Sequence, residues 1–285
     1  MPNFLEGAGI GLRAPHLKEL LTNNQLAEQV GWLEVLADNW LAKGGYNRDG
    51  LLALCERFPS VIHSVGLSLG GQAPINIDYL NQIRDLQRDT GSLMYSEHLS
   101  FSDADGRFVP DLLPLPYTDE SLAYVCQRVQ QVQEVIKQPL VIENVSAYIR
   151  CPDNQMSEAE FLGQLCQRSG CKLLLDLNNA YVNSVNFGED LAKYISGYPI
   201  EQVAYLHLAG FEDKGDYLLD AHNHPICAAV WRLFEQVQQG AGPIPTLIEW
   251  DHQLPELSQL LEERNKAQAI IDTLARRAEP CLQAV

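Results

Sequence analysis

The sequence predicts an α/β fold of the (β/α)8 or TIM barrel class that forms a single domain over residues 1–285. Three observations predict it. Strand-like apolar runs alternate regularly with helical stretches along the whole chain. Several of these runs end in a side chain that can bind a metal ion, as expected at the carboxyl ends of barrel strands. The chain is also 46% hydrophobic, which is enough to bury one large core.

The predicted strands are short apolar runs bounded by turn residues. In chain order they cover residues 9–13, 32–37, 61–67, 93–99, 140–145, 173–177, 203–208 and 246–250. The predicted helices cover residues 17–30, 48–58, 77–89, 119–137, 157–168, 189–196, 228–239 and 255–277. Two of these helices carry start signals, since Asn76 precedes one and Ser157 opens a capping-box pattern with Glu160.

A doubly wound open sheet is the competing architecture, because it also alternates strands with helices. The barrel is favoured because the strand–helix units span the full chain. The glycine-rich segment 7–11 lacks the GxGxxG spacing of a dinucleotide-binding loop and runs into the first strand. The sequence also contains no Walker lysine loop and no GxSxG elbow.

Charge and composition exclude several classes of partner. The chain carries 37 acidic against 20 basic residues, a net charge of −17, which argues against nucleic acid as the main partner. No apolar run approaches the roughly 18 residues of a membrane span, and residues 1–6 do not resemble a secretory signal. The seven cysteines form no CxxC pair, so we expect reduced structural thiols in a cytoplasmic protein.

Polar residues at the strand ends predict the functional site. The carboxyl ends of barrel strands surround one mouth, where active sites of this fold lie. The side chains that we expect there and that can bind a metal ion are His63, His98, Glu143, Asp176, Asn179, His207, Asp220, His222 and Glu249. Glu97 and Arg13 also stand at strand ends, and Arg13 would bind a carboxylate or pair with the acidic rim.

Each of these residues alone has a structural explanation, as a hydrogen-bonded histidine or as a carboxylate that caps the next helix. Their convergence favours a metal centre, because carboxylates held close together cannot all stay ionised without cations. Mixed nitrogen and oxygen ligands suit zinc, manganese or iron. With carboxylates able to bridge, this set would serve two or three ions.

A metal-free alternative uses Glu143 and Glu249 as the acid and base of a glycosidase. That alternative is disfavoured because it leaves the histidines without a role. The remaining histidines, His16, His224 and His252, are expected to be structural or to face the substrate.

Six linked motifs resemble those of the multinuclear non-haem iron-dependent oxidative enzymes, a family that includes the oxidase component of methanobactin biosynthesis. They occur at residues 9–16 (GIGLRAPH), 96–100 (SEHLS), 142–146 (IENVS), 176–184 (DLNNAYVNS), 207–210 (HLAG) and 220–222 (DAH). The resemblance covers essentially the whole chain. Six motifs in one order are far more specific than any one of them.

The resemblance implies an O2-dependent oxidase with two or three iron ions (Fe2+/Fe3+), with zinc or manganese as the alternative metals. Its substrate would be a cysteine-containing precursor peptide made on the ribosome, and its products oxazolone–thioamide or thiooxazole-type heterocycles. A small partner protein would recognise the leader segment of the peptide. All nine residues expected at the mouth would hold the ions, with Glu143, Asp176 and Asn179 at the catalytic centre and Glu143 bridging.

The wider resemblance is to xylose-isomerase-like barrels, whose abasic-site endonuclease members hold three zinc ions. The endonuclease pattern has a histidine where this chain has Asn179, and an amide ligand fits an iron site better than a closed zinc cluster. A metal-dependent hydrolase or isomerase on the same barrel is therefore the alternative function. An isomerase of sugars is disfavoured because this sequence offers no obvious catalytic lysine beside the metal. A non-catalytic metal-binding protein is the third hypothesis.

Overall fold

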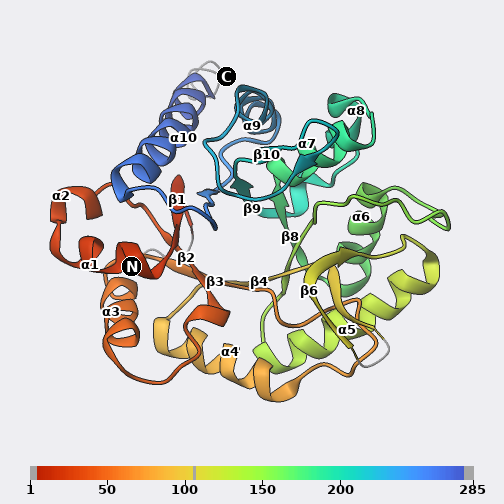
Figure 1. The fold of residues 1–285 in the computed structure, drawn as a ribbon, viewed down its shortest axis with the longest axis horizontal. Helices are drawn as coiled ribbons and strands as arrows, with labels where there is room; N and C mark the ends of the chain where they lie inside the picture. Colours follow the sequence, from red (N-terminus) through yellow and green to blue (C-terminus); the bar gives the residue numbers. More distant parts are fainter. Residues whose placement is uncertain (1–4, 105–106, 279–285) are drawn as a thin grey trace, which may run out of the picture.

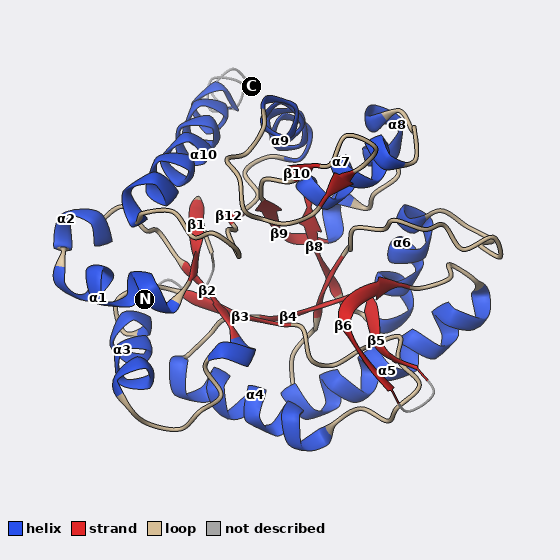
Figure 2. Ribbon diagram, viewed as in Figure 1, coloured by secondary structure: helices blue, strands red, loops and turns tan. Residues whose placement is uncertain are grey.

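The computed structural model describes residues 5–104 and 107–278. Parallel strands close into one barrel in the order β1-β12-β9-β8-β7-β4-β3-β2, and helices surround it (Figures 1 and 2). This closure confirms the predicted fold class and excludes the open doubly wound sheet. The expected lack of a secretory signal rests partly on residues 1–4, which lie outside the described residues, as does Cys281. None of the helices in the described part of the chain is long and apolar enough to cross a membrane.

Each predicted strand coincides with one strand of the barrel, with ends that differ by a few residues. The barrel strands are β1 (Ala8–Leu12), β2 (Leu33–Leu36), β3 (Ser60–Ser64), β4 (Tyr95–His98), β7 (Val141–Glu143), β8 (Lys172–Asp176), β9 (Val203–Leu208) and β12 (Thr246–Ile248). Two antiparallel hairpins that the sequence did not predict pair β5 (Ser100–Ala104) with β6 (Arg107–Pro114), and β10 (Glu212–Asp213) with β11 (Leu218–Leu219). They follow β4 and β9, at the carboxyl end of the barrel.

The helices largely follow the predicted order. They are α1 (Ala14–Thr22), α2 (Asn24–Ala27), α3 (Tyr46–Cys55), α4 (Ile77–Thr90), α5 (Asp119–Ile136), α6 (Glu158–Ser169), α7 (Leu177–Asn186), α8 (Leu191–Ser196), α9 (Ala228–Ala241) and α10 (Leu257–Ala278), with 3-10 turns η1 (Ala37–Asn39) and η2 (Ile200–Gln202). The expected caps are present, since Asn76 accepts from the Tyr79 amide and Ser157 forms a capping box with Glu160. The single helix expected over 17–30 was wrong, because Asn23 ends α1 and caps α2.

Helix α7 was missed by the sequence analysis, although it carries part of the site. Strand β8 passes directly into it, and Asp176 is its N-cap, accepting the Asn179 amide at 2.8 Å. Asparagines favour turns over helices because their side chains compete for backbone hydrogen bonds, so this segment was not expected to be helical. Burial of Leu177, Ala180 and Val182 against the barrel overrides that preference.

The interior of the barrel is layered, because alternate residues of each strand point inward. One layer is an apolar cluster formed by Leu5, Trp32, Val61, Val141, Leu174, Tyr205 and Leu247. Two residues further along the same strands come the buried polar residues Glu34, His63, Glu143, Asp176, His207 and Glu249. The apolar cluster therefore forms a floor on which a polar layer rests at the carboxyl end of the barrel.

The floor makes a testable demand on Gly9 in β1. A methyl group at this position would lie 2.4 Å from the Trp32 ring and 2.6 Å from the Trp32 carbonyl oxygen. We therefore expect Gly9→Ala to lower the free energy of unfolding by about 1–3 kcal/mol, measured by urea denaturation.

Gly240→Ala in α9 is the matched control, because a methyl group there meets nothing within 4 Å. The control should keep or slightly raise the stability, by up to about 1 kcal/mol. A Gly9→Ala protein as stable as the control would show that Trp32 does not pack tightly against β1.

Candidate metal centre

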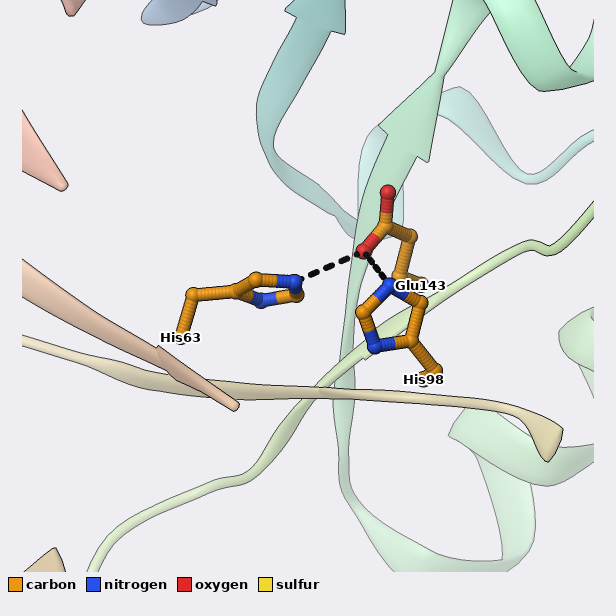
Figure 3. A group of neighbouring side chains, drawn as sticks. All are labelled: His63, His98 and Glu143. Carbon is orange, nitrogen blue, oxygen red and sulfur yellow. Dashed lines mark ion pairs between the residues drawn. The ribbon is translucent and has the colours of Figure 1, made fainter. Parts of the chain in front are cut away.

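Glu143 ends β7 and lies between one histidine from β4, which pairs with β7, and one from β3, the strand beyond β4. Its Oε2 atom lies 3.2 Å from His63 Nε2 and 3.1 Å from His98 Nε2 (Figure 3). Parallel pairing sets this arrangement, since His98 is in register with Glu143 and His63 with Ser96. The ligand atoms of the three side chains lie within 4.8 Å of one another, which makes the group a candidate site for one ion.

A second group shares Glu143 and adds residues from β8, β9 and the end of β12. His207 Nδ1 lies 2.9 Å from Glu249 Oε2, 3.4 Å from Glu143 Oε1 and 4.0 Å from Asp176 Oδ2. Glu143 thus turns one oxygen toward His63 and His98, and the other toward His207. That is the position of a carboxylate able to bridge two ions.

A third group lies on the far side of Asp176. His222 Nε2 lies 2.6 Å from Asp220 Oδ1 and 3.9 Å from Asp176 Oδ2. Asn178 donates to Asp220 at 2.7 Å and holds that carboxylate in place. Asn179 donates its side-chain N–H to the Asn144 carbonyl at 3.1 Å, so its amide oxygen stays available.

Unpaired polar atoms gather in these groups. Within the described residues, the buried atoms without a hydrogen-bond partner include Glu143 Oε2, Asp176 Oδ2, Asn178 Oδ1, Asn179 Oδ1, His207 Nδ1 and His222 Nε2. Leaving such an atom buried and unpaired costs about 1–3 kcal/mol. Bound cations would satisfy these nitrogen and oxygen atoms together, so the residues present fit a cluster of metal ions.

Each of the four histidines also has an outer hydrogen-bond partner on its second ring nitrogen. The pairs are His63 Nδ1 with Ser96 Oγ (2.8 Å), His98 Nδ1 with the Ser64 carbonyl (3.1 Å), His207 Nε2 with Glu34 Oε2 (2.9 Å) and His222 Nδ1 with Asp251 Oδ2 (3.0 Å). Metal-binding histidines almost always have such an outer acceptor, which fixes the tautomer and the ring orientation. In each case the other nitrogen faces the carboxylates described above.

Sequence analysis missed Glu34 and Asp251. Glu34 stands inside an apolar strand instead of at its end, and only the alternation with Trp32 signals that it points inward. Asp251 follows Glu249 by two residues and forms an ion pair with Arg13. His222, Glu249 and Asp251 also group closely enough to hold an ion, although Asp251 is already bonded to Arg13.

The other polar residues that the sequence placed near the mouth have structural roles. Glu97 accepts hydrogen bonds from Ser64 Oγ and from the backbone amides of Leu67 and His98. Arg13 pairs with Asp251 and lies 3.7 Å from Glu249, which matches its expected pairing with the acidic rim. The remaining histidines, His16, His224 and His252, bond to the Pro255 carbonyl, Asn223 and the Ala221 carbonyl, respectively. The described cysteines form no disulfide.

The buried charged side chains of this cluster strongly shift one another's pKa values. Burial alone would lower the pKa of His207, but Glu34, Glu249 and Glu143 outweigh it and raise that pKa well above its ordinary value. Burial raises the pKa of Asp176, and the nearby Glu143 raises it further, against the lowering effect of His222. Protons on His98, His207 and His222, whose pKa values are all raised, thus stand in for the positive charge that metal ions would bring.

These shifts predict that metal affinity depends on pH. Burial alone would lower the pKa of His98, but Glu143 and Glu97 raise it to about 9. A metal ion must displace that proton, so we expect the affinity of ion-stripped protein for Zn2+ to rise between pH 6.5 and about 9. The slope from this group alone is about tenfold per pH unit.

Calorimetric titration in buffers with different ionisation heats measures the protons released on binding. His98→Gln should release fewer protons than the unmodified protein at pH 7. An affinity that stays constant from pH 6.5 to 9 would contradict the proposed displacement of the proton.

Comparison with known proteins places the chain within a described family. The family described as RiPP precursor modification enzyme MbnB/TglH/ChrH matches residues 7–272. A UPF0276 protein of Acaryochloris marina is 40% identical over 263 residues, which cover 92% of this chain and 94% of that protein. A UPF0276 protein of Pseudomonas aeruginosa is 41% identical over 264 residues, covering 92% of each chain.

Solved structures with the same fold are more distant in sequence. L-ribulose 3-epimerase aligns with a TM-score of 0.62 at 17% identity, covering 99% of each chain. Endonuclease IV from Thermus thermophilus aligns with a TM-score of 0.58 at 14% sequence identity, covering 92% of this chain and 98% of that one. A xylose isomerase-like TIM barrel protein from Mycobacterium smegmatis in complex with magnesium aligns with a TM-score of 0.57 at 13% sequence identity. The alignment covers 95% of this chain and 98% of that one. At these identities the likeness shows the fold alone, and it confirms that this chain shares the barrel fold of the xylose-isomerase-like protein.

Proposed function

The chain belongs to the MbnB/TglH/ChrH family of precursor-modifying enzymes for ribosomally synthesised and post-translationally modified peptides (RiPPs), and from this premise we propose that it is an O2-dependent iron oxidase. Its substrate is a cysteine residue of a ribosomally made precursor peptide, converted to an oxazolone–thioamide or thiooxazole-type product. The observation that carries the proposal is the convergence of unpaired, buried nitrogen and oxygen atoms in one mouth of the barrel.

The proposed centre holds two or three iron ions. His63, His98 and Glu143 form the first site, and Glu143, Asp176, His207 and Glu249 form the second. Asn179, Asp220 and His222 form the third site beside Asp176. Two sites share Glu143, and this sharing is why we assign the bridging role to it.

Bound iron would keep a substrate cysteine deprotonated at neutral pH and would supply the redox chemistry for O2. The chain itself determines the side from which the substrate arrives. The side chains of His98, Asp220 and His222 are 11–12% exposed, whereas those of Glu143, Asp176 and His207 are at most 1% exposed. We therefore assign the peptide to the rim formed by His98, Asp220 and His222.

The floor of Trp32, Leu174 and Tyr205 excludes water from below, so the reacting groups meet solvent only at the rim. Asn179 is a neutral ligand whose orientation is fixed by the Asn144 carbonyl. An amide oxygen binds less strongly than an imidazole or a carboxylate, so its position suits exchange with a substrate atom.

A small protein that recognises the leader of the peptide is part of the proposal, as the family resemblance implies. The net charge of −17 favours a basic leader or partner. Such binding would weaken as salt is added, because screening reduces the attraction between opposite charges.

The first test is the metal content of protein purified without chelators. We expect two or three irons per chain by elemental analysis. With a cysteine-containing precursor peptide and its partner protein, the iron-loaded enzyme should change the mass of the peptide at cysteine only when O2 is present. Zinc without iron, retained after growth in iron-rich medium, would favour the alternative metal-dependent hydrolase.

A second test concerns the bridge. Glu143→Gln keeps the size of the side chain but removes its charge, so we expect loss of at least one bound metal ion per chain and no oxidation of the peptide. The barrel should stay folded by circular dichroism, because its stability comes mainly from its apolar layers. Full activity with normal iron content would refute the bridging role of Glu143.

A further inference from the structure

Glu34 is a buried carboxylate that belongs to none of the three candidate ion groups. It lies in β2, faces inward above Trp32 and is 1% exposed. Its Oε2 atom accepts two hydrogen bonds, from His207 Nε2 at 2.9 Å and from the Tyr205 hydroxyl at 2.9 Å. A carboxylate at this depth needs such partners, because an unpaired buried charge is very costly.

The hydrogen bonds continue from Glu34 to a second histidine. The Tyr205 hydroxyl lies 2.6 Å from Ser96 Oγ, which lies 2.8 Å from His63 Nδ1. A hydrogen-bond chain therefore runs from His207 through Glu34, Tyr205 and Ser96 to His63. All five residues are at most 1% exposed, so bulk water does not reach these hydrogen bonds.

Only one arrangement of protons uses the full length of this chain with Glu34 ionised. The carboxylate accepts only, so both the Tyr205 hydroxyl and the His207 Nε2–H donate to it. The Tyr205 oxygen then accepts from Ser96, and the Ser96 oxygen accepts from the Nδ1–H of His63. The alternative acceptor for Ser96, the Ile62 carbonyl, is farther away at 3.2 Å.

When both imidazoles are neutral, as ion binding requires, this arrangement leaves the two remaining ring nitrogens free of hydrogen. They are His207 Nδ1 and His63 Nε2, which lie 3.4 Å and 3.2 Å from the two oxygens of Glu143. Both nitrogens are therefore ready to bind ions on either side of the bridging carboxylate.

We propose that Glu34 is a positioning residue that sets the tautomers of His207 and His63 together and so links the two ion sites that Glu143 bridges. The inference rests on the metal centre proposed above. The other two histidines are outside this control, since His98 bonds to the Ser64 carbonyl and His222 to Asp251.

Two substitutions separate the branches of the chain. Glu34→Gln keeps the shape of the side chain but removes its negative charge, so the two hydrogen bonds that one oxygen accepts from His207 and Tyr205 are no longer charge-assisted and become weaker. Tyr205→Phe leaves the bond between Glu34 and His207 and cuts only the branch to His63.

Matched controls exist elsewhere in the chain. Glu158 is also buried and accepts the hydroxyl groups of Tyr117, Tyr194 and Tyr198, away from the proposed ligands. Glu158→Gln and Tyr198→Phe therefore remove a buried carboxylate charge and a tyrosine hydroxyl without touching the centre.

The experiment titrates ion-stripped protein with Co2+ in competition with a chelator, following the visible absorption that reports nitrogen ligation. We expect Glu34→Gln to lower the affinity for two Co2+ ions by about 10–100-fold and to alter the absorption. Tyr205→Phe should lower the affinity for one ion only. The control variants should bind like the unmodified protein. If Glu34→Gln does not fold, the loss of affinity for one ion in Tyr205→Phe still tests the hydrogen-bond chain.

Unchanged affinities and spectra in folded Glu34→Gln and Tyr205→Phe, with normal binding by the unmodified protein, would overturn this inference alone. Equal losses in the control variants would also overturn it, because they would show a general effect of lost stability. An unmodified protein that binds no Co2+ would instead refute the metal centre itself and, with it, this role of Glu34.

Discussion

The structure depends on the constraint that every second residue of a barrel strand points into the interior of the barrel. Side chains that face inward cannot turn away, so the sequence must fill each layer deliberately. Here an apolar floor that includes Trp32, Leu174 and Tyr205 lies two residues before a layer of carboxylates and imidazoles. The floor removes water from below this polar layer. Its nitrogen and oxygen atoms must then find partners in the protein or in bound ions.

Hydrogen-bond partners within the protein are divided unevenly between the outer and inner polar atoms of these side chains. Asp176 gives one oxygen to the cap of α7 and leaves the other unpaired, while each histidine bonds outward through one nitrogen. The outer atoms thus have hydrogen-bond partners, whereas inner atoms that include Asp176 Oδ2, His207 Nδ1 and His222 Nε2 have no hydrogen-bond partner and lie only against other charged side chains of the cluster. A site kept only for stability would satisfy both, because unpaired buried atoms lower the free energy of unfolding. The asymmetry therefore points to occupants of positive charge at the centre.

Much of this could be predicted from the sequence, because the barrel converts strand position directly into spatial position. His63, Glu143, Asp176 and His207 each close an apolar run or stand within one residue of its end, and parallel pairing brings strand ends together. Glu34 could not be identified in this way because it lies within its strand, where only the phase of alternation shows that it points inward. Helix α7 and the two hairpins were missed because tertiary packing, and not local preference, determines them.

Depth within the barrel separates two tasks that the nine predicted residues would share. The deepest side chains, Glu143, Asp176 and His207, are surrounded by one another and by other groups of the protein, so their arrangement is set by the fold and not by a substrate. The rim residues His98, Asp220 and His222 have one side open to solvent. In the proposed centre, the deep residues would therefore fix the ions and the rim would meet the peptide. The hairpins β5–β6 and β10–β11 leave the barrel at this same end, so in the proposed centre a peptide at the rim would lie beside them.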